Sequence, residues 1–597
     1  MRMFLRTYIL AVLLFLTLGV NTANTESMKK LKVDDVSFTG IKAFTTRHLS
    51  HVMITRESHF LRSFHYNEEV FQEDLKALEL FYHQNGYLDA VTTDYHVQVD
   101  STRFKAYIKI TISEGELTHV EGVSVLGNNV FPDSLLLEKI SILQGEPFQP
   151  KKIEDSTVNI LTFYADHGYL DAEVQPDIKI NTEMNRALVD FNIKEKVPFT
   201  IGDIHLKGLE KTRKNVAMRE LLFNPGEVVN YSLLLKSQRN IYMTGLFQSV
   251  FIRPQTSVNG DSTKKDILVD VKENISGEFN MAFGYGSVER VRGKMEVYNN
   301  NVRGTSLKLG LVGTISFIQH SIEMSFTNPW TLGTPMRTDM NLIQENKDEP
   351  GYDLSRIGGK MIIGRRFQNN NITLTYRHEN TKLSNIKVKI ITDTPKSNTR
   401  SLKLSFINDT RDNLFNSTKG VFFETSGEFG GFFTSRTIKF YRIIGQLKYY
   451  YPLNPHTVIA TSLESGLMDA EGGFGLIPLH ERFYAGGPNS LRSFEYEKVG
   501  PLDIKRVPIG GKLKFVWNIL EVRRTLYKMI GGVVFADIGN VWLKPDNVSL
   551  GDLRTSLGLG LRISTPIGLA RLDYGINTDR RKGEPQGQVY FSMGQAF

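Results

Sequence analysis

The second half of the chain alternates apolar and polar residues with a period of two. Segment 556–564 places Leu557, Leu559, Leu561 and Ile563 on one face, and serine, glycine and arginine on the other. Segment 571–577 repeats the pattern. A period of two predicts β-strands with two different faces. Alternation alone fits either a soluble β-sandwich or a transmembrane barrel, because both have one apolar and one polar face.

The first 273 residues carry a different pattern, which repeats three times. Each copy has an amphipathic helical segment that ends at a glycine, where a helix end needs a left-handed residue. A strand that ends in glycine opens each copy, and an alternating strand closes it. The turns lie at 81–90, 163–172 and, more loosely, 241–247; the opening strands end at Gly40, Gly127 and Gly208. The pattern predicts three small α+β modules of order β-α-α-β-β, with a period of roughly 80 residues.

The amino-terminus predicts export. A basic start at 1–6 is followed by an apolar run at 8–20 and a polar stretch ending near Ala23. The run is short for a bilayer span and fits a secretory signal peptide over 1–23, with a retained anchor as the alternative. No later stretch reaches 18 uninterrupted apolar residues, so we expect any membrane span to be built of strands.

Three observations favour the barrel over the sandwich. The chain carries an export signal, strand patterns fill more than 300 residues without a helical segment, and aromatics gather at 449–451, Trp330 and Trp542. At about 20 residues per strand and connection, residues 274–597 supply about 16 strands, an even number as such barrels require. The expected fold is three α+β modules (30–116, 117–197 and 198–273) followed by an all-β, 16-stranded transmembrane barrel at 274–597.

Composition excludes several classes of function. The chain has no cysteine, so it has no disulfide, thiolate metal site or cysteine nucleophile. The net charge of +8 permits attraction to anionic lipid, but no long Lys/Arg block suggests a nucleic-acid partner. No phosphate-binding loop or serine nucleophile elbow is present, and the 13 histidines are scattered. We therefore expect no enzyme activity and no cofactor, with an outer-membrane hydrolase as the alternative from another class.

One loop-forming stretch stands out within the strand-rich half. Gly486 and Gly487, followed by proline, cannot continue a regular strand. Arg492 then lies between the apolar Leu491 and Phe494, next to Ser493. This stretch is either a solvated surface turn or a loop that places a guanidinium in a specific site.

The last strand pattern has an aromatic end. Val589, Phe591, Met593 and Phe597 share one face. An alternating strand that ends on an aromatic residue resembles the carboxy-terminal assembly signal of bacterial outer-membrane proteins.

Several segments together resemble a known family. The repeated modules look like polypeptide-transport-associated (POTRA) domains. Segments 408–420, 535–542 and 556–574, and the stretch 482–494, resemble strands and the lumenal loop of the BamA/TamA family of outer-membrane assembly barrels, with TamA as the most similar member. The usual glycine of the loop tip is Ser493 here. Serine has a Cβ, so a left-handed backbone at that position would carry some strain.

The resemblance implies a role for the arginine. In such barrels the loop folds into the lumen, and Arg492 would be held there by a wall carboxylate. Asp537 is the best partner because it shares the inward face with Phe535, whose ring could pack on the guanidinium. Glu521 on the preceding strand is a second candidate, although Trp517 and Ile519 interrupt the alternation around it.

The resemblance also implies a function and a location. The chain would lie in the bacterial outer membrane, with its amino-terminal modules in the periplasm, and would insert or export client outer-membrane or secreted proteins. A weak lateral seam beside the first strand (277–286) would admit client strands. Partners would be clients, outer-membrane lipid and a periplasmic, TamB-like subunit. A two-partner-secretion pore is the alternative, but that branch typically carries two modules and a plug helix, whereas three modules are predicted here.

Overall fold

The computed structural model describes residues 31–597, except for 59–62, 258–259, 389–394, 415, 432–438, 566–567 and 595–597. The predicted signal peptide and Phe597 therefore lie outside the described residues. By its contacts the chain forms two compact units. The first comprises Met1–His205, Leu222–Gln238 and Ile252–Val269, and the second comprises the remaining residues, including the barrel.

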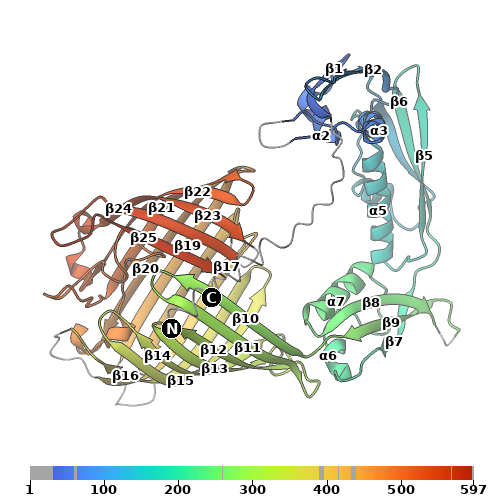
Figure 1. The fold of residues 1–597 in the computed structure, drawn as a ribbon. Coiled ribbons are helices and arrows are strands. Elements are labelled where there is room, and N and C mark those ends of the chain that lie inside the picture. The colour runs from blue at the N-terminus through green and yellow to red at the C-terminus, as the bar shows by residue number, and fades with distance from the viewer. Residues whose placement is uncertain are drawn as a thin grey trace, which may run out of the picture. The chain divides into compact units, whose positions relative to one another are not determined.

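Three modules of order β-α-α-β-β precede the barrel, as the repeats predicted (Figure 1). In each module the last strand lies in the centre of a three-stranded sheet, in the orders β1-β3-β2, β4-β6-β5 and β7-β9-β8. Module 1 contains β1 (Lys32–Thr39), α2 (Thr46–Val52), α3 (Glu68–Gln84), β2 (Val91–Asp100) and β3 (Lys105–Ser113); module 2 contains β4 (His119–Leu126), α4 (Asp133–Leu137), α5 (Pro150–Asp166), β5 (Glu173–Asn181) and β6 (Arg186–Lys194); module 3 contains β7 (Thr200–Lys207), α6 (Lys214–Met218), α7 (Tyr231–Met243), β8 (Phe247–Thr256) and β9 (Lys264–Glu273).

The opening glycine of each module is needed because another backbone passes beside it. Gly40, Gly127 and Gly208 have φ of 83°, 84° and 88°. A Cβ at these positions would lie 2.2, 2.3 and 1.8 Å from a carbonyl oxygen of the central strand, so no larger residue fits. The glycine that ends each opening strand therefore marks a close approach between that strand's end and the central strand.

A glutamate at the end of the central strand, buried in modules 1 and 2 and half-buried in module 3, holds the loop that follows the first strand of its module. Glu114 accepts hydrogen bonds from the Ala43 backbone N–H and the Tyr82 hydroxyl. Glu195 accepts corresponding bonds from Val130 and from Tyr164. In module 3, Glu273 accepts hydrogen bonds from the backbone N–H groups of residues 210–212.

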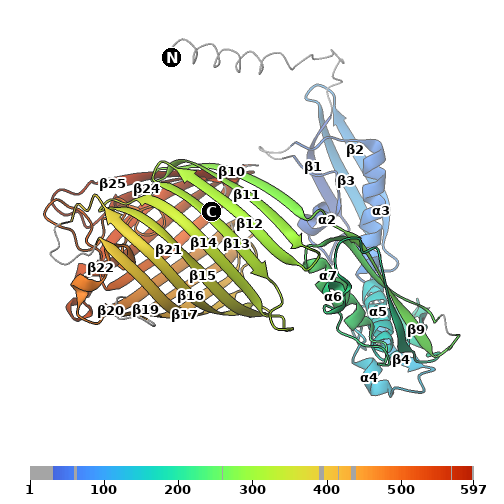
Figure 2. The same cartoon turned by 90° about the horizontal axis from the view of Figure 1, so that it is seen from below.

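Sixteen antiparallel strands close into a barrel, as predicted (Figure 2). The strands are β10 (Gly277–Gly286), β11 (Arg290–Val302), β12 (Leu307–Ser316), β13 (Gln319–Asn328), β14 (Arg337–Asp348), β15 (Asp353–Phe367), β16 (Asn370–Ser384), β17 (Lys396–Asp409), β18 (Gly420–Gly430), β19 (Phe440–Asn454), β20 (Thr457–Ala470), β21 (Leu513–Tyr527), β22 (Ile530–Trp542), β23 (Arg554–Thr565), β24 (Gly568–Asn577) and β25 (Gly587–Gly594). Among the described residues, no helix is both long and apolar enough to cross a bilayer.

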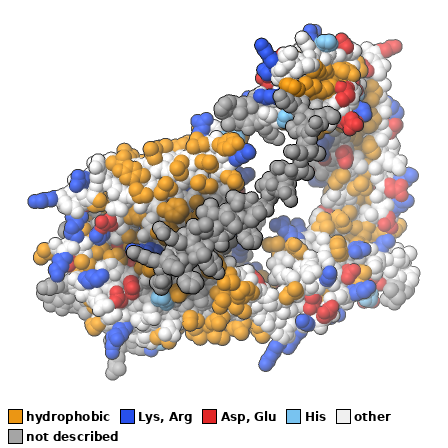
Figure 3. All heavy atoms as spheres, in the orientation of Figure 1, with side chains coloured by type: hydrophobic (Ala, Val, Ile, Leu, Met, Phe, Trp, Pro, Cys, Tyr) orange, Lys and Arg blue, Asp and Glu red, His pale blue; other side chains and the backbone are white. Residues whose placement is uncertain are grey.

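Whether the apolar face of the strands is exposed or buried decides whether the second half is a transmembrane barrel or a soluble sandwich. Leu557, Leu559 and Leu561 are all exposed on the outside, whereas Ser556 is buried inside. Apolar side chains cover much of the barrel wall in Figure 3. An exposed apolar band around a polar interior is the arrangement of a transmembrane barrel, and a soluble sandwich would bury its apolar faces.

Within the second unit, module 3 contacts the barrel at its first turns. The Arg213 backbone N–H donates to the Gly304 carbonyl at 2.9 Å. The Arg219 guanidinium lies 5.1 Å from the Trp330 ring centroid, and the Trp330 indole N–H donates to Glu220 at 2.8 Å. Module 3 therefore contacts the end of the barrel formed by the turns that follow β11 and β13.

Candidate functional site

Between β20 and β21 the chain leaves the barrel wall for residues 471–512, which we call the lumenal loop. The loop contains two short 3-10 turns, η1 (Phe474–Leu476) and η2 (Leu479–Glu481). Leu491 and Phe494 are buried in one apolar cluster with Met468, Val516 and Val541 of the wall. The stretch is therefore packed inside the barrel and is not a solvated surface turn.

The structure places Arg492 of this loop against the wall carboxylate Asp537. The guanidinium Nε and Nη2 donate to the two Asp537 oxygens at 3.0 and 2.7 Å, and the Arg492 backbone N–H donates to the same carboxylate at 3.2 Å. The guanidinium carbon lies 3.5 Å from the centroid of the Phe535 ring. Arg492 is 5 % exposed and Asp537 is 2 % exposed, so this planar, two-bond contact is shielded from water.

Glu521 completes the contact from the neighbouring strand. It forms an ion pair with the Arg492 Nη1, and it also accepts a 2.6 Å bond from Arg523. The pairing register of β21 shifts between Asn518 and Leu520. This bulge explains why the alternation around Ile519 is interrupted in the sequence: one extra residue changes which side chains face the lumen.

The expected strain at Ser493 does not occur. Ser493 is fully buried, and it is not among the residues with positive φ. The left-handed positions of the loop are instead Gly486 and Gly487, with φ of 102° and 109°. The tip therefore tolerates serine because the backbone at that residue needs no left-handed conformation.

Glycines of the wall form a seat for the loop tip, a feature that the sequence reasoning missed. A Cβ at Gly575 would lie 2.5 Å from the Arg492 carbonyl oxygen and 2.7 Å from the Ser493 nitrogen. A Cβ at Gly558 would lie 2.2 Å from the Phe535 ring. One feature of the sequence could have identified them: both glycines lie at inward positions of strands with strong apolar–polar alternation.

The last strand also contacts the loop tip. The Tyr590 hydroxyl donates to the Phe494 carbonyl at 2.6 Å. The Arg554 guanidinium lies 4.7 Å from the centroid of the Phe494 ring and pairs with Glu584. Sequence reasoning singled out neither Tyr590 nor Arg554, because only the loop's position makes them neighbours.

A second charged cluster holds the beginning of the loop. Glu481 pairs with Arg377 and Arg442 at 3.0 Å each, and both arginines also pair with Glu428. Glu481 and Glu428 are buried, so the two arginines are needed to neutralise them. The loop is therefore fixed at two points, at Glu481 and at Arg492.

The barrel closes through a short seam between β10 and β25. β10 pairs with β11 along its whole length, from Gly277 to Gly286. Among the described residues it pairs with β25 at three positions: Gly284 with Gly594, Tyr285 with Met593, and Gly286 with Ser592. Just beyond them, the Ser287 backbone N–H donates to the Phe591 carbonyl at 2.8 Å.

The predicted carboxy-terminal residues lie on this seam strand. Val589 is exposed on the outer face, and Phe591 and Met593 are half-buried. Phe597, the fourth member, is outside the described residues. No cluster of three His, Asp or Glu side chains in the described ranges could hold a metal ion.

Comparisons with known proteins agree with this architecture. Residues 301–597 match the Omp85 superfamily domain, and residues 31–115, 118–196 and 199–274 match the POTRA repeat, described as a surface antigen variable number repeat. The chain is 25% identical to the outer membrane protein assembly factor BamA of Nitratidesulfovibrio vulgaris, over 96% of this chain and 74% of that protein. It is 22% identical to BamA of Neisseria meningitidis serogroup B, over 95% of this chain and 78% of that protein.

A solved structure shares the fold. BamA from Haemophilus ducreyi lacking POTRA domains 1–3 superposes with a TM-score of 0.69 at 21% identity, covering 80% of this chain and all of that one. The POTRA repeats and the barrel domain place the protein in the outer membrane with its modules in the periplasm. The chain belongs to the Omp85 superfamily of outer-membrane proteins, with three POTRA repeats ahead of its barrel domain.

Proposed function

We propose that this protein is an outer-membrane assembly factor that inserts client barrels through its β10–β25 seam. The observation that carries the proposal is the seam itself, which pairs at three positions among the described residues, whereas β10 and β11 pair along all of β10. Where β10 has no described partner in β25, a client strand could pair with its backbone donors and acceptors. Its relatives named as assembly factors support the same reading.

The lumenal loop would keep the closed seam in register. Its tip contacts Asp537 on β22 and Tyr590 on β25, so one loop connects the wall to the seam strand. Because the described pairing across the seam covers three positions, a fixed inner contact of this kind would add to its stability. The proposal assigns no bond-making chemistry to any residue.

The modules would receive clients at their sheet edges. β2 and β5 are edge strands, and β2 exposes Val91, Tyr95 and Val99. An extended client segment could add to such an edge through backbone hydrogen bonds. A TamB-like periplasmic subunit is a further proposed partner of these modules, and pull-down with residues 24–273 from the native envelope would identify it.

A seam that is locked by a disulfide tests the mechanism. The natural chain has no cysteine, so Gly286→Cys with Ser592→Cys introduces the only pair. Directly paired antiparallel residues lie within disulfide range. A matched control places the pair at Ser325 and Asn341, which are paired between β13 and β14.

The assay reconstitutes each protein in lipid vesicles and follows insertion of an unfolded eight-stranded barrel by its heat-modifiable migration. We expect the oxidised seam variant to lose insertion and reduction to restore it, while the control stays active in both states. Full activity of the oxidised, fully cross-linked seam variant would contradict the proposal. Secretion of one dedicated protein without barrel insertion would favour the two-partner pore instead.

A further inference from the structure

The outer wall of the barrel carries two adjoining hollows. The first, of about 440 Å³, lies across β10 to β14, and the second, of about 520 Å³, lies across β14 to β17. Gln344 of β14 lines both. Each volume is within the range of small-molecule sites, and neither hollow belongs to the lumenal site.

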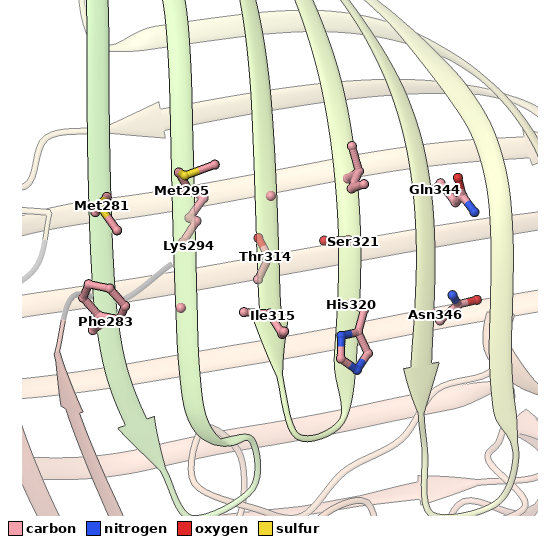
Figure 4. Close-up of a pocket in the computed structure, with 13 residues that line it drawn as sticks. Met281, Phe283, Lys294, Met295, Thr314, Ile315, His320, Ser321, Gln344 and Asn346 are labelled. Carbon is pink, nitrogen blue, oxygen red and sulfur yellow. The ribbon is translucent and has the colours of Figure 1, made fainter.

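The first hollow is apolar and exists because two outward positions are glycines. Gly293 and Gly313 lie among the outward side chains of Met295, Ile315 and Ile322. A Cβ at Gly313 would meet no atom within 4 Å, so the wall is open where a side chain is missing. Figure 4 shows Met281 and Phe283 of β10 at one side of this hollow, with His320, Gln344 and Asn346 toward the other.

The second hollow is polar and cationic. Lys382 of β16 and Lys396 of β17 are directly paired, and Asn380 and Asn398 form the adjacent pair. Like charges directly opposite one another destabilise a sheet. In the described parts of the chain, neither lysine forms a salt bridge. Asp353 of β15 is the outward carboxylate two residues from Ser355, the residue paired with Lys382, and it is hydrogen-bonded to Asn385. The two ammonium groups together would attract a doubly charged anion such as phosphate.

The pairing register joins the two hollows into one surface. Directly paired residues on neighbouring strands form a single row that runs from Gly313 through Ile322 and Gln344 to Ile357 and Asn380. With neighbouring strands about 4.8 Å apart, β12 and β16 are separated by about 19 Å along this row. The lysines lie near the loop end of β16, opposite the periplasmic end at which module 3 is attached, and therefore at the level of the outer leaflet.

We propose that this surface binds a phosphorylated lipid of the outer leaflet. Its acyl chain fills the hollow at Gly313, and its phosphate lies between Lys382 and Lys396. Each buried methylene favours binding, and the phosphate relieves the repulsion between the lysines. Because Met281 and Phe283 belong to β10, the bound lipid packs against the outward face of the seam strand.

Native mass spectrometry of the full-length protein in detergent tests this site. The probe is hexa-acylated lipid A with two phosphates, compared with the same lipid after removal of its phosphates and with inorganic phosphate alone. The charge variant is Lys382→Gln with Lys396→Gln, and its control is Lys528→Gln in the turn between β21 and β22. The hollow-filling variant is Gly313→Val, and its control is Gly445→Val on β19, where a Cβ also meets no atom within 4 Å.

We expect the charge variant and removal of the phosphates each to weaken binding about tenfold, which corresponds to the loss of one charge-assisted contact. Gly313→Val should weaken binding several-fold, and both controls should bind as the wild type does. Heat-modifiable migration of every variant verifies that the barrel is folded. Equal binding by the wild type and the charge variant would overturn the proposal, and so would displacement of the lipid by an equal concentration of inorganic phosphate.

Discussion

The Tyr590 hydroxyl donates a 2.6 Å hydrogen bond to the Phe494 carbonyl, which joins the last barrel strand to the tip of the lumenal loop. Both residues are buried, at 7 % and 3 % exposure. The bond spans 96 positions of sequence and reaches the strand that closes the seam. Loop docking and seam closure are therefore connected by a direct contact, so a change in one should alter the other.

Tyr590→Phe should loosen the seam without unfolding the barrel. The variant keeps the ring but leaves the buried Phe494 carbonyl without this donor, at a cost of roughly 1–3 kcal/mol. Cross-linking between cysteines at positions 286 and 592 measures seam closure, and we expect it to slow. Tyr574→Phe, on the outward face of β24, is the control and should leave the rate unchanged. Equal cross-linking rates in all three proteins would refute the connection.

Arg492→Ala should release the loop tip. The variant leaves Asp537 and Glu521 with fewer partners, and a shielded charge-assisted contact of this kind contributes roughly 1.5–3 kcal/mol, about ten- to a hundredfold in the docked population. Arg492→Lys should rescue only part of the loss, because an ammonium cannot match both carboxylate oxygens in a planar fork. Access of protease to residues 471–512 measures docking. Arg337→Ala, which breaks an ion pair with Asp339 on β14, is the control.

A double-mutant cycle tests whether Arg492 and Asp537 act as a pair. Asp537→Ala should reproduce much of the defect, although Asp537 also accepts a 2.8 Å bond from Asn518. The double variant should be little worse than either single variant. Strictly additive losses would show that both residues matter independently and would remove the pairing.

Gly575→Ala should displace the loop tip although it adds only one methyl group. The new Cβ would lie 2.5 Å from the Arg492 carbonyl oxygen, and backbone atoms at the tip must move to admit it. Overpacking of this kind typically costs about 1–3 kcal/mol. Gly427→Ala on β18, where a Cβ meets no atom within 4 Å, is the matched control. Protease access to the loop should rise for Gly575→Ala alone. If Gly575→Ala protects the loop as well as the wild type does, the loop tip accommodates the added methyl group and this prediction is wrong.

Module 2 should lose stability in acid through Glu195. Burial raises the pKa of this carboxyl, but the Val130 backbone N–H and the Tyr164 hydroxyl outweigh it and hold the pKa below its ordinary value of 4.5. A lowered folded-state pKa contributes stability above the ordinary pKa, and this contribution is lost as the pH falls through the lowered value. Thermal unfolding of fragment 31–274 as a function of pH measures it.

Two variants test whether the Glu195 carboxyl causes the loss of stability in acid. Glu195→Gln should flatten the acid side of the profile. Tyr164→Phe removes a donor that lowers the pKa, so the acid loss should begin at higher pH, with roughly 1 kcal/mol less stability at neutral pH. An unchanged profile in Glu195→Gln would assign the acid sensitivity to other groups.

The sequence by itself determined the elements and their faces. Period-two alternation identified the strands, and glycines at the ends of strands and helices marked the three modules, because these signals depend on local sterics and on which side of an element is apolar. The inward positions of Asp537 and Phe535 followed from the same alternation. A closed barrel was favoured, but not required, by the sequence: the predicted export signal, more than 300 residues of strand patterns without a helical segment and the gathered aromatics together favoured it over a soluble sandwich.

Only the tertiary structure decided which residues meet inside the barrel. The seat at Gly575, the Tyr590 contact and the Glu481 cluster join residues from strands far apart in sequence, and strand periodicity contains no information on such distances. The bulge at Ile519 changed the register beside Glu521, and bulges have no fixed sequence signature. The loop's own geometry corrected the expectation at Ser493, because φ at one residue is set by the packing of the whole tip rather than by its neighbours in sequence.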